Sequence, residues 1–311
     1  MNGFGHGRSG GRSRWQVLLL LGSSCVCTLG QPRGKVLVVA TSAAGPYGTA
    51  LAGLRAGLDR GGQVMTMIDL SAAAPGAPAE WIHAHGPDLI VAVGSQAMRA
   101  VASVDRHGPV ISAMVLGPDG QSSGAVAVLG LEPAPERWIE RLSALFPRLR
   151  RLGLLAGKAT PVSKLDAVEF SAKRMGYTVW RVQCTDVSEA LTAISSMAGK
   201  VDLLWFAPDS TLFNDATVKP LLLAALQRQV PVIGFSEAFV RSGAAVGFFA
   251  DYGDIGLHAA EVTQRVLSGG AVAGFETPRV VKVAVNERVM RILGLRRQTT
   301  GPNAVEALVI R

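Results

Sequence analysis

The sequence predicts an α/β protein built from two doubly wound, Rossmann-like lobes, each with a parallel sheet covered by helices. Short runs rich in Val, Ile and Leu alternate with segments of helical periodicity along most of the 311 residues. The two halves also repeat one another, because residues 87–111 correspond to residues 201–233 at an offset of about 120 residues. We therefore expect two similar lobes rather than one very wide sheet.

The first half contains four apolar runs typical of buried parallel strands, at residues 35–40, 64–70, 88–93 and 110–116. Helix-period positions separate these runs, at residues 47–60, 77–85 and 95–105. A further strand is expected at residues 124–131. This half therefore predicts one complete strand–helix lobe.

The second half repeats the alternation. Helices are expected at residues 135–146, 163–175, 187–198 and 215–229, and strands at residues 151–156, 177–183, 201–206 and 232–235. After residue 237 come strand 245–249, helix 254–267, strand 280–285 and helix 287–293. These last elements are too few for a third domain, so we expect them to complete the two lobes.

The chain is then expected to cross between the lobes three times. The predicted N-terminal lobe comprises residues 34–128 and 250–277, and the predicted C-terminal lobe comprises residues 130–248 and 279–296. A three-strand hinge of this kind would let the lobes close on a ligand with little change inside either. The tail at residues 297–311 shows no pattern that indicates a role.

The N-terminus has the order of a secretory signal peptide over residues 1–30. Residues 1–14 are rich in Gly, Ser and Arg without an acid, and an apolar stretch follows at residues 17–29. That stretch is shorter than the ~20 residues of a membrane-spanning helix. We therefore expect export to the periplasm or another extracytoplasmic space. A lipid anchor at Cys25 is the less favoured alternative, because Gly22 stands where a lipobox has Leu; a disordered tail or a start codon placed too early is another.

Composition limits the function classes. With 49% hydrophobic residues the chain is not disordered, and three cysteines exclude a disulfide-built scaffold. The net charge of +8 raises the question of nucleic acid, but most basic residues are scattered. The densest clusters fall where predicted helices end, a position that cations favour in any case: Arg148, Arg150 and Arg151, and Arg288, Arg291, Arg296 and Arg297. We predict no nucleic-acid partner.

No residue pattern indicates catalysis, a metal or a cofactor. The sequence lacks a phosphate-binding loop, a dinucleotide fingerprint that follows a strand, and a Gly-x-Ser-x-Gly turn. His83 and His85 would point in different directions on a helix, and no further ligand completes a metal set. We therefore expect a binding protein rather than an enzyme.

Polar and aromatic residues follow the predicted strands, where open α/β sheets bind ligands. Ten of them are candidate ligand-binding residues: Ser42, Tyr47, Gly94, Ser95, Met114, Asp209, Phe235, Ser236, Glu237 and Tyr252. Other strand-end candidates are Thr41, residues 115–117, residues 156–158, Pro208 and Ser210.

Each candidate also has a purely structural interpretation. Asp209 could bind a ligand amine or cap the following turn, and Glu237 could accept a hydrogen bond from ligand or stabilise a helix start. The serines could donate to a carboxylate at a helix N-terminus or act only as caps. Tyr47 and Phe235 could flank an apolar ligand or pack in the core. Tyr252 could serve the hinge or the ligand.

Three segments of the second half resemble the ABC-transporter substrate-binding protein family that includes tryptophan-binding lipoproteins. They are residues 205–212, residues 230–244 and the run Asp251-Tyr-Gly-Asp-Ile-Gly256 followed by His258. The resemblance extends over residues 34–296. It implies a periplasmic-binding-protein-like type I fold, a monomer that captures a small organic solute, and delivery of that solute to a membrane permease.

Two departures from the family pattern mean that the resemblance does not identify the solute. The first crossover at residues 124–128 lacks the Asn and Thr that the family often has there, and His258 replaces a usual Gln. An amino-acid-like solute is favoured, since the candidates mix hydroxyl groups, helix N-termini, carboxylates and aromatic rings. The alternatives are the ligand-sensing module of a receptor or regulator, and an enzyme that uses the same cleft.

Overall fold

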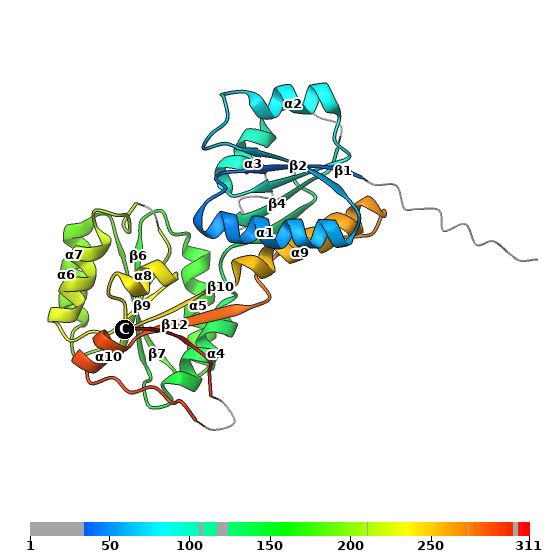
Figure 1. Cartoon of the computed structure of the whole chain (residues 1–311). Helices are drawn as coiled ribbons and strands as arrows, with labels where there is room; N and C mark the ends of the chain where they lie inside the picture. Colours follow the sequence, from blue (N-terminus) through cyan, green and yellow to red (C-terminus); the bar gives the residue numbers. More distant parts are fainter. Residues whose placement is uncertain (1–33, 106–107, 117–123, 210, 273, 301–303) are drawn as a thin grey trace, which may run out of the picture. The chain divides into compact units, whose positions relative to one another are not determined.

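The computed structural model describes residues 34–105, 108–116, 124–209, 211–272, 274–300 and 304–311. The signal peptide expected over residues 1–30 lies outside these ranges. The described chain forms two α/β lobes, each with its own sheet and with helices on both faces of that sheet (Figure 1).

The first sheet has the strand order β11-β5-β4-β3-β1-β2, and its paired strands run parallel. Its strands are β1 (Lys35–Ala40), β2 (Val64–Asp69), β3 (Leu89–Val93), β4 (Val110–Val115), β5 (Ala127–Gly130) and β11 (Phe275–Glu276). Strands β1, β3 and β4 are almost entirely buried, as continuous Val, Ile and Leu runs require.

Helices α1 (Gly45–Arg60) and α9 (Tyr252–Leu267) cover one face of this sheet, and α2 (Ala77–His85) and α3 (Ser95–Ala102) cover the other. Although about 200 residues separate them in sequence, α1 and α9 lie side by side (Figure 1). Glycine permits this approach: a Cβ at Gly256 would stand 1.9 Å from the carbonyl oxygen of Ala50, and one at Gly53 would stand 2.2 Å from that of Gly253.

The second sheet has the order β13-β12-β10-β9-β8-β6-β7. Its strands are β6 (Arg151–Gly157), β7 (Thr178–Cys184), β8 (Leu203–Phe206), β9 (Val232–Gly234), β10 (Val246–Ala250), β12 (Val281–Asn286) and β13 (Leu308–Ile310). One face packs against α4 (Pro135–Leu145), α5 (Val162–Arg174) and α10 (Glu287–Ile292), and the other against α6 (Val187–Met197), α7 (Val218–Gln227) and α8 (Glu237–Arg241).

The sheets are parallel as expected except at one pair: β12 runs antiparallel to β10, with Val246 opposite Val285 and Ala250 opposite Val281. The connection explains this. The chain leaves the second sheet at the carboxyl end of β10, contributes α9 and β11 to the first lobe, and returns at the same end, so β12 must run in the opposite direction. Strand β13, in the tail for which the sequence indicated no role, then pairs parallel with β12.

The strand orders place a topological switch point in each sheet. Strand β1 lies between β2 and β3 in the first sheet, and β6 lies between β7 and β8 in the second. In doubly wound sheets the connections diverge here, which leaves the carboxyl ends of the two central strands accessible to a ligand. The residues after β1, β3, β6 and β8 are therefore the best-placed candidates.

Candidate functional site

At the switch point of the first lobe, the residues after β1 and β3 are in close contact. Gly94 has φ +93°, and a Cβ there would stand 2.4 Å from Thr41 Oγ1 and 2.8 Å from Tyr47 Cε1. Only glycine fits this conformation and this space. Thr41 Oγ1 in turn accepts a hydrogen bond from the Ala97 amide at 3.2 Å, so the residue that follows β1 caps helix α3. Thr41, Tyr47 and Gly94 thus form one unit, as their positions after adjacent strands predicted.

Ser95 begins helix α3 directly beside this unit. Within the described part of the chain the amides of Ser95 and Gln96 donate no hydrogen bond, whereas the next two amides donate to Thr41 Oγ1 and Gly94 O. Two free amides and the Ser95 hydroxyl at a helix N-terminus are suited to an anion such as a carboxylate.

The loop that carries Ser42 is held in place by Asp69, the last residue of β2. Ser42 Oγ accepts a hydrogen bond from the Ala44 amide at 3.1 Å, and the Ala43 amide donates to Asp69 Oδ2 at 3.0 Å. The hydroxyl and amide of Ser71 also donate to Asp69, and these bonds, with that from Ala43, lower the pKa of Asp69. Asp69 therefore stays ionised and holds the loop, while Ser42 acts at least as a local cap.

Met114 lies at the carboxyl end of β4 in an uncommon backbone conformation. Its φ is +60°, and the pairing of β4 with β5 is irregular between Ala113 and Val115. A left-handed conformation at a non-glycine residue stores strain and recurs at functional sites. The side chain itself is buried in the core of the first lobe, so it shapes this edge of the sheet from within.

At the switch point of the second lobe, Asp209 is almost fully buried, with 8% of its surface exposed. Its Oδ2 accepts a hydrogen bond from Thr160 Oγ1 at 2.9 Å, and its Oδ1 accepts from the amide and hydroxyl of Thr211 and from the Leu212 amide. Burial alone would raise the pKa of Asp209, but the hydrogen bonds from Thr211 and Thr160 outweigh burial and lower it. The carboxylate therefore caps the turn after β8.

The segment after β9 contributes one ring to the core and the N-cap of helix α8. The ring of Phe235 lies 4.7 Å from that of Phe239, and Ser236 Oγ accepts the Phe239 amide at 3.1 Å as the N-cap of α8. Glu237 pairs with Arg241 one turn later, at 2.5 Å. Glu237 remains about 40% exposed and Phe235 is half-buried, so both retain surface for a ligand.

Tyr252 lies where the chain passes from β10 to α9, and its ring packs against the cores of both lobes. Burial raises the pKa of its phenol, and the nearby carboxylate of Glu237 raises it further. The preceding Asp251 caps α9 and forms an ion pair with Lys282 of β12 at 2.9 Å. Tyr252 thus occupies a crossing point between the lobes and also approaches the residues after β9.

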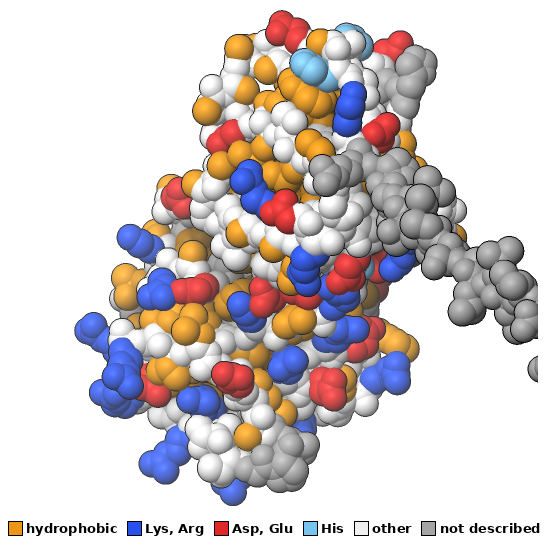
Figure 2. Space-filling model, turned by 45° about the vertical axis from the view of Figure 1, so that its right-hand side comes forward, with side chains coloured by type: hydrophobic (Ala, Val, Ile, Leu, Met, Phe, Trp, Pro, Cys, Tyr) orange, Lys and Arg blue, Asp and Glu red, His pale blue; other side chains and the backbone are white. Residues whose placement is uncertain are grey.

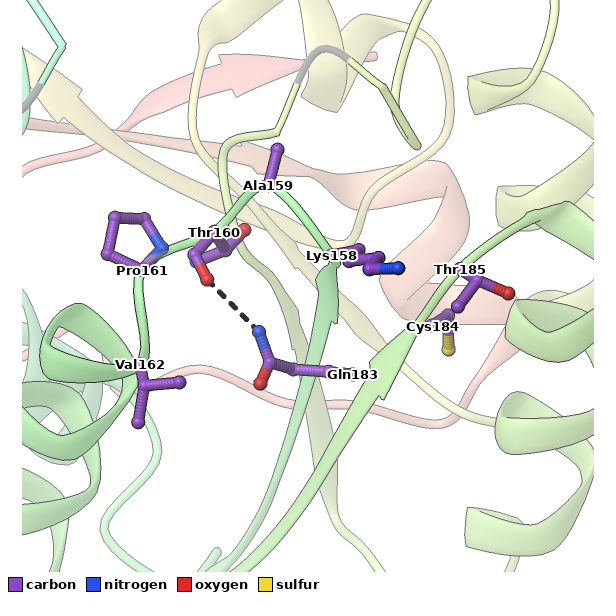
Figure 3. A pocket seen from close by; sticks show the side chains of 8 residues that line it. All are labelled: Lys158, Ala159, Thr160, Pro161, Val162, Gln183, Cys184 and Thr185. Atoms are coloured by element: carbon purple, nitrogen blue, oxygen red, sulfur yellow. Dashed lines mark hydrogen bonds between the residues drawn. The ribbon is translucent and has the colours of Figure 1, made fainter.

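A pocket of about 390 Å³ opens at the carboxyl ends of β6 and β7 (Figure 3). Its lining residues are Lys158, Ala159, Thr160, Pro161, Val162, Gln183, Cys184 and Thr185. The side-chain amide Nε2 of Gln183 donates a hydrogen bond to the Thr160 carbonyl oxygen at 3.0 Å and closes one side. Lys158 is exposed and makes no ion pair within the described part of the chain.

The candidates therefore fall into two groups. Ser42, Tyr47, Gly94, Ser95 and Met114 lie at the carboxyl edge of the first sheet, whereas Asp209, Phe235, Ser236, Glu237 and Tyr252 lie at or beside that of the second. Sequence reasoning missed Thr160, Gln183 and Thr185 of the pocket. Their only signal was position at the carboxyl end of a strand, Thr160 after β6, Gln183 near the end of β7 and Thr185 after it, and this signal is weak because β7 is an edge strand. Gly117 and Ser210 lie outside the described residues.

Among the described residues, no group of three or more His, Cys, Asp and Glu side chains is arranged to hold a metal ion. None of the described helices combines the length and apolar character needed to cross a membrane.

Comparison with known proteins gives a family. The model of the family described as ABC transporter substrate binding protein matches residues 57–299. The chain belongs to this family. The expected relationship and the expected two-lobed type I fold are therefore confirmed.

One curated relative illustrates how far the sequence has diverged. A tyrosine-binding protein of Clostridioides difficile is 24% identical over 226 residues, which cover 68% of this chain and 64% of that protein. The match thus spans less than two thirds of the curated relative.

Solved structures show the same fold. The ligand-free, open structure of a Clostridium difficile substrate-binding protein with adhesive properties has a TM-score of 0.72 at 19% identity, covering 89% of this chain and 99% of that one. A domain from Streptococcus pneumonia in complex with L-Trp has a TM-score of 0.61 at 20% identity, covering 89% and 100%.

Proposed function

We propose that this chain is the extracytoplasmic solute-binding component of an ABC importer and that it captures an amino acid by closure of its two lobes. The observation that carries the proposal is the pair of switch points, one in each sheet, whose carboxyl ends bear polar groups in a chain of the substrate-binding family. Tyrosine and L-tryptophan, named for two of its relatives, make an aromatic amino acid the first solute to test.

The two lobes offer complementary chemistry for such a solute. The free amides of Ser95 and Gln96 at the start of α3 would bind the carboxylate. Glu237 is the better partner for the ammonium group, because Asp209 already accepts four hydrogen bonds and is almost fully buried. The rings of Tyr47 and Phe235 would contact an apolar or aromatic side chain.

Closure would use the three crossings between the lobes. They follow β5, β10 and β11, and Tyr252 lies in the second crossing. A hinge of this kind changes a few connecting residues while each sheet stays intact. The solute would then pass to a membrane permease, and the protein would act as a monomer without chemistry of its own.

A thermal-shift screen of the purified protein against the twenty amino acids, sugars and purines tests the proposal, since a ligand that binds only the folded state raises the melting temperature. We expect a rise of several degrees with one or a few amino acids. The Glu237→Gln variant should lose most of this rise, while Glu80→Gln, on the remote helix α2, should retain it. A rise with sugars or purines alone would contradict the amino-acid assignment.

A further inference from the structure

Positive charge is divided unequally between the two lobes. Residues 34–130 and 252–276, which build the first lobe, contain 6 Lys and Arg against 9 Asp and Glu. Residues 135–250 and 281–311, which build the second, contain 20 against 12, a formal charge of +8. In Figure 2 the blue side chains are correspondingly more frequent over the lower, larger lobe.

This excess lies at one end of the second lobe, the end formed by the amino termini of its parallel strands. We call this end the basic pole and define it by ten residues: Arg148, Arg150, Arg151, Arg174, Lys200, Arg228, Arg288, Arg291, Arg296 and Arg297. All are exposed except Arg297, which is half-buried. The acids in the same turns are Asp202 and Glu287, so the basic pole alone carries the whole +8 of the lobe.

Several contacts join the segments of the basic pole. The Gln298 amide donates to the carbonyl oxygen of Leu145 at 2.8 Å, which brings the turn after α10 to the end of α4. Asp202, after Lys200, accepts hydrogen bonds from the amides of Arg150 and Arg151. Several apolar neighbours of the basic residues pack against the same core: Leu149, Met175, Leu226, Leu293 and Leu295.

Most of this charge is uncompensated. Arg151 forms an ion pair with Asp202 at 2.7 Å. Arg148, Arg228, Arg291 and Arg296, by contrast, make no ion pair within the ranges that the structure describes. Like charges held together in this way repel one another and favour an anionic partner.

Two exposed apolar side chains stand among these cations, Ile292 and Phe170, and the Arg174 guanidinium lies 5.7 Å from the centre of the Phe170 ring. Ile292, at the end of α10 beside Arg291, is 53% exposed. A bilayer surface offers phosphate groups to the cations and an apolar layer beneath them to the isoleucine. Nucleic acid would also match the cations, and the exposed ring of Phe170 beneath Arg174 could stack on a base.

We propose that the basic pole docks on the surface of an anionic phospholipid bilayer, with its arginines on the lipid phosphates and Ile292 in the headgroup layer. The choice of a bilayer as the partner rests on the proposed extracytoplasmic function. The unequal charge distribution is observed independently of that function. Docking would hold the second lobe at the membrane independently of the solute.

Co-sedimentation with vesicles tests this, using the full chain in every arm so that residues 1–33 contribute equally. The pole variant carries Arg148→Gln, Arg228→Gln, Arg291→Gln and Arg296→Gln. The control variant removes four exposed charges elsewhere, by Arg55→Gln, Arg99→Gln, Lys219→Gln and Arg265→Gln. Vesicles of phosphatidylcholine with 30% phosphatidylglycerol are compared with pure phosphatidylcholine at low and high salt.

The pole variant should bind the anionic vesicles at least tenfold more weakly than the unaltered chain, and the control variant should stay within about threefold of it. The difference should vanish at high salt and on pure phosphatidylcholine. Ile292→Ser should weaken binding severalfold without changing its salt dependence. Equal binding by pole and control variants would overturn the proposal, as would loss of duplex DNA binding in the pole variant with vesicle binding unchanged.

Measurements of solute binding distinguish a failure of membrane docking from a failure of the proposed transport function. All variants should melt at the same temperature and give the same ligand-induced shift, because the basic pole lies at the opposite ends of the strands from the candidate site. A chain that binds vesicles through the basic pole but binds no solute would refute the transport function alone.

Discussion

Thr160 donates a hydrogen bond of 2.9 Å to the buried carboxylate of Asp209 and so joins the loop after β6 to the loop after β8. These two strands flank the switch point of the second sheet. Asp209 also caps the turn that follows it, through Thr211 and Leu212. The acid that the sequence offered both as a ligand contact and as a cap is therefore a fixed part of the loop framework.

Replacing Asp209 by Ala should lower the free energy of unfolding by about 1–3 kcal/mol, because a cap and two side-chain hydrogen bonds are lost together. The exposed Asp215 serves as the control, and Asp215→Ala should unfold like the unaltered chain. Urea denaturation followed by circular dichroism measures both. Calorimetry should show an unchanged solute Kd for Asp209→Ala; a Kd weakened tenfold at unchanged stability would show a ligand contact instead.

His258 should make the stability depend on pH near neutrality. Burial lowers the pKa of this histidine, and the charge of Arg279 lowers it further, although Glu276 lies 3.2 Å from its Nε2. A lowered folded-state pKa means that the stability is fully present above the unfolded value of about 6.5 and is lost as the pH falls through the folded value.

The melting temperature should therefore fall between pH 7 and pH 5. In His258→Gln this part of the pH dependence should disappear. His83→Gln, an exposed control on α2, should leave the pH profile unchanged. Scanning calorimetry at several pH values gives the comparison, and identical profiles for all three chains would refute the role of His258.

Cys184 should be an inert thiol in the folded protein. It is buried beneath the pocket, and burial raises its pKa to about 11, with smaller contributions from Glu189 and Asp186. The thiolate is the reactive form, so alkylation by iodoacetamide at pH 8 should be slow until the protein unfolds. Peptide mass spectrometry distinguishes Cys184 from Cys25 and Cys27. Rapid labelling of Cys184 in the native protein would contradict the burial.

The crossing of α1 and α9 should be intolerant of any side chain at Gly256. A Cβ there would stand 1.9 Å from the Ala50 carbonyl oxygen, so Gly256→Ala must push the helices apart, at a cost of about 1–3 kcal/mol. Gly253→Ala in the same helix is the matched control, because its Cβ would meet nothing closer than 3.4 Å. Equal melting temperatures for the two variants would contradict the tight crossing.

The sequence predicted the two lobes and nearly all strands because buried parallel strands are continuous apolar runs, such as β3 and β4. It did not predict β11 and β13, because two- and three-residue strands carry too little pattern. Nor could it predict the direction of β12, which depends on where the chain returns rather than on local residues.

The candidate site was predictable only in part. Position after a strand pointed to Thr41, Tyr47 and Gly94 one by one, and the structure brings them into contact because adjacent strands end at the same edge, while their role as ligand contacts stays a prediction. It could not show that the carboxylate of Asp209 is already saturated, because Thr160 lies 49 residues away in sequence. For the same reason the sequence showed both arginine clusters of the basic pole but not that they meet, because they are more than 130 residues apart and come together only in the folded lobe.

The most direct test of the central claim is calorimetric titration of the purified protein with L-tyrosine and L-tryptophan. We predict saturable binding of at least one of them with a stoichiometry of one, weakened in Glu237→Gln and unchanged in Asp209→Ala. Absence of binding by any of the twenty amino acids to a correctly folded protein would contradict the account of this chain as an amino-acid-binding protein.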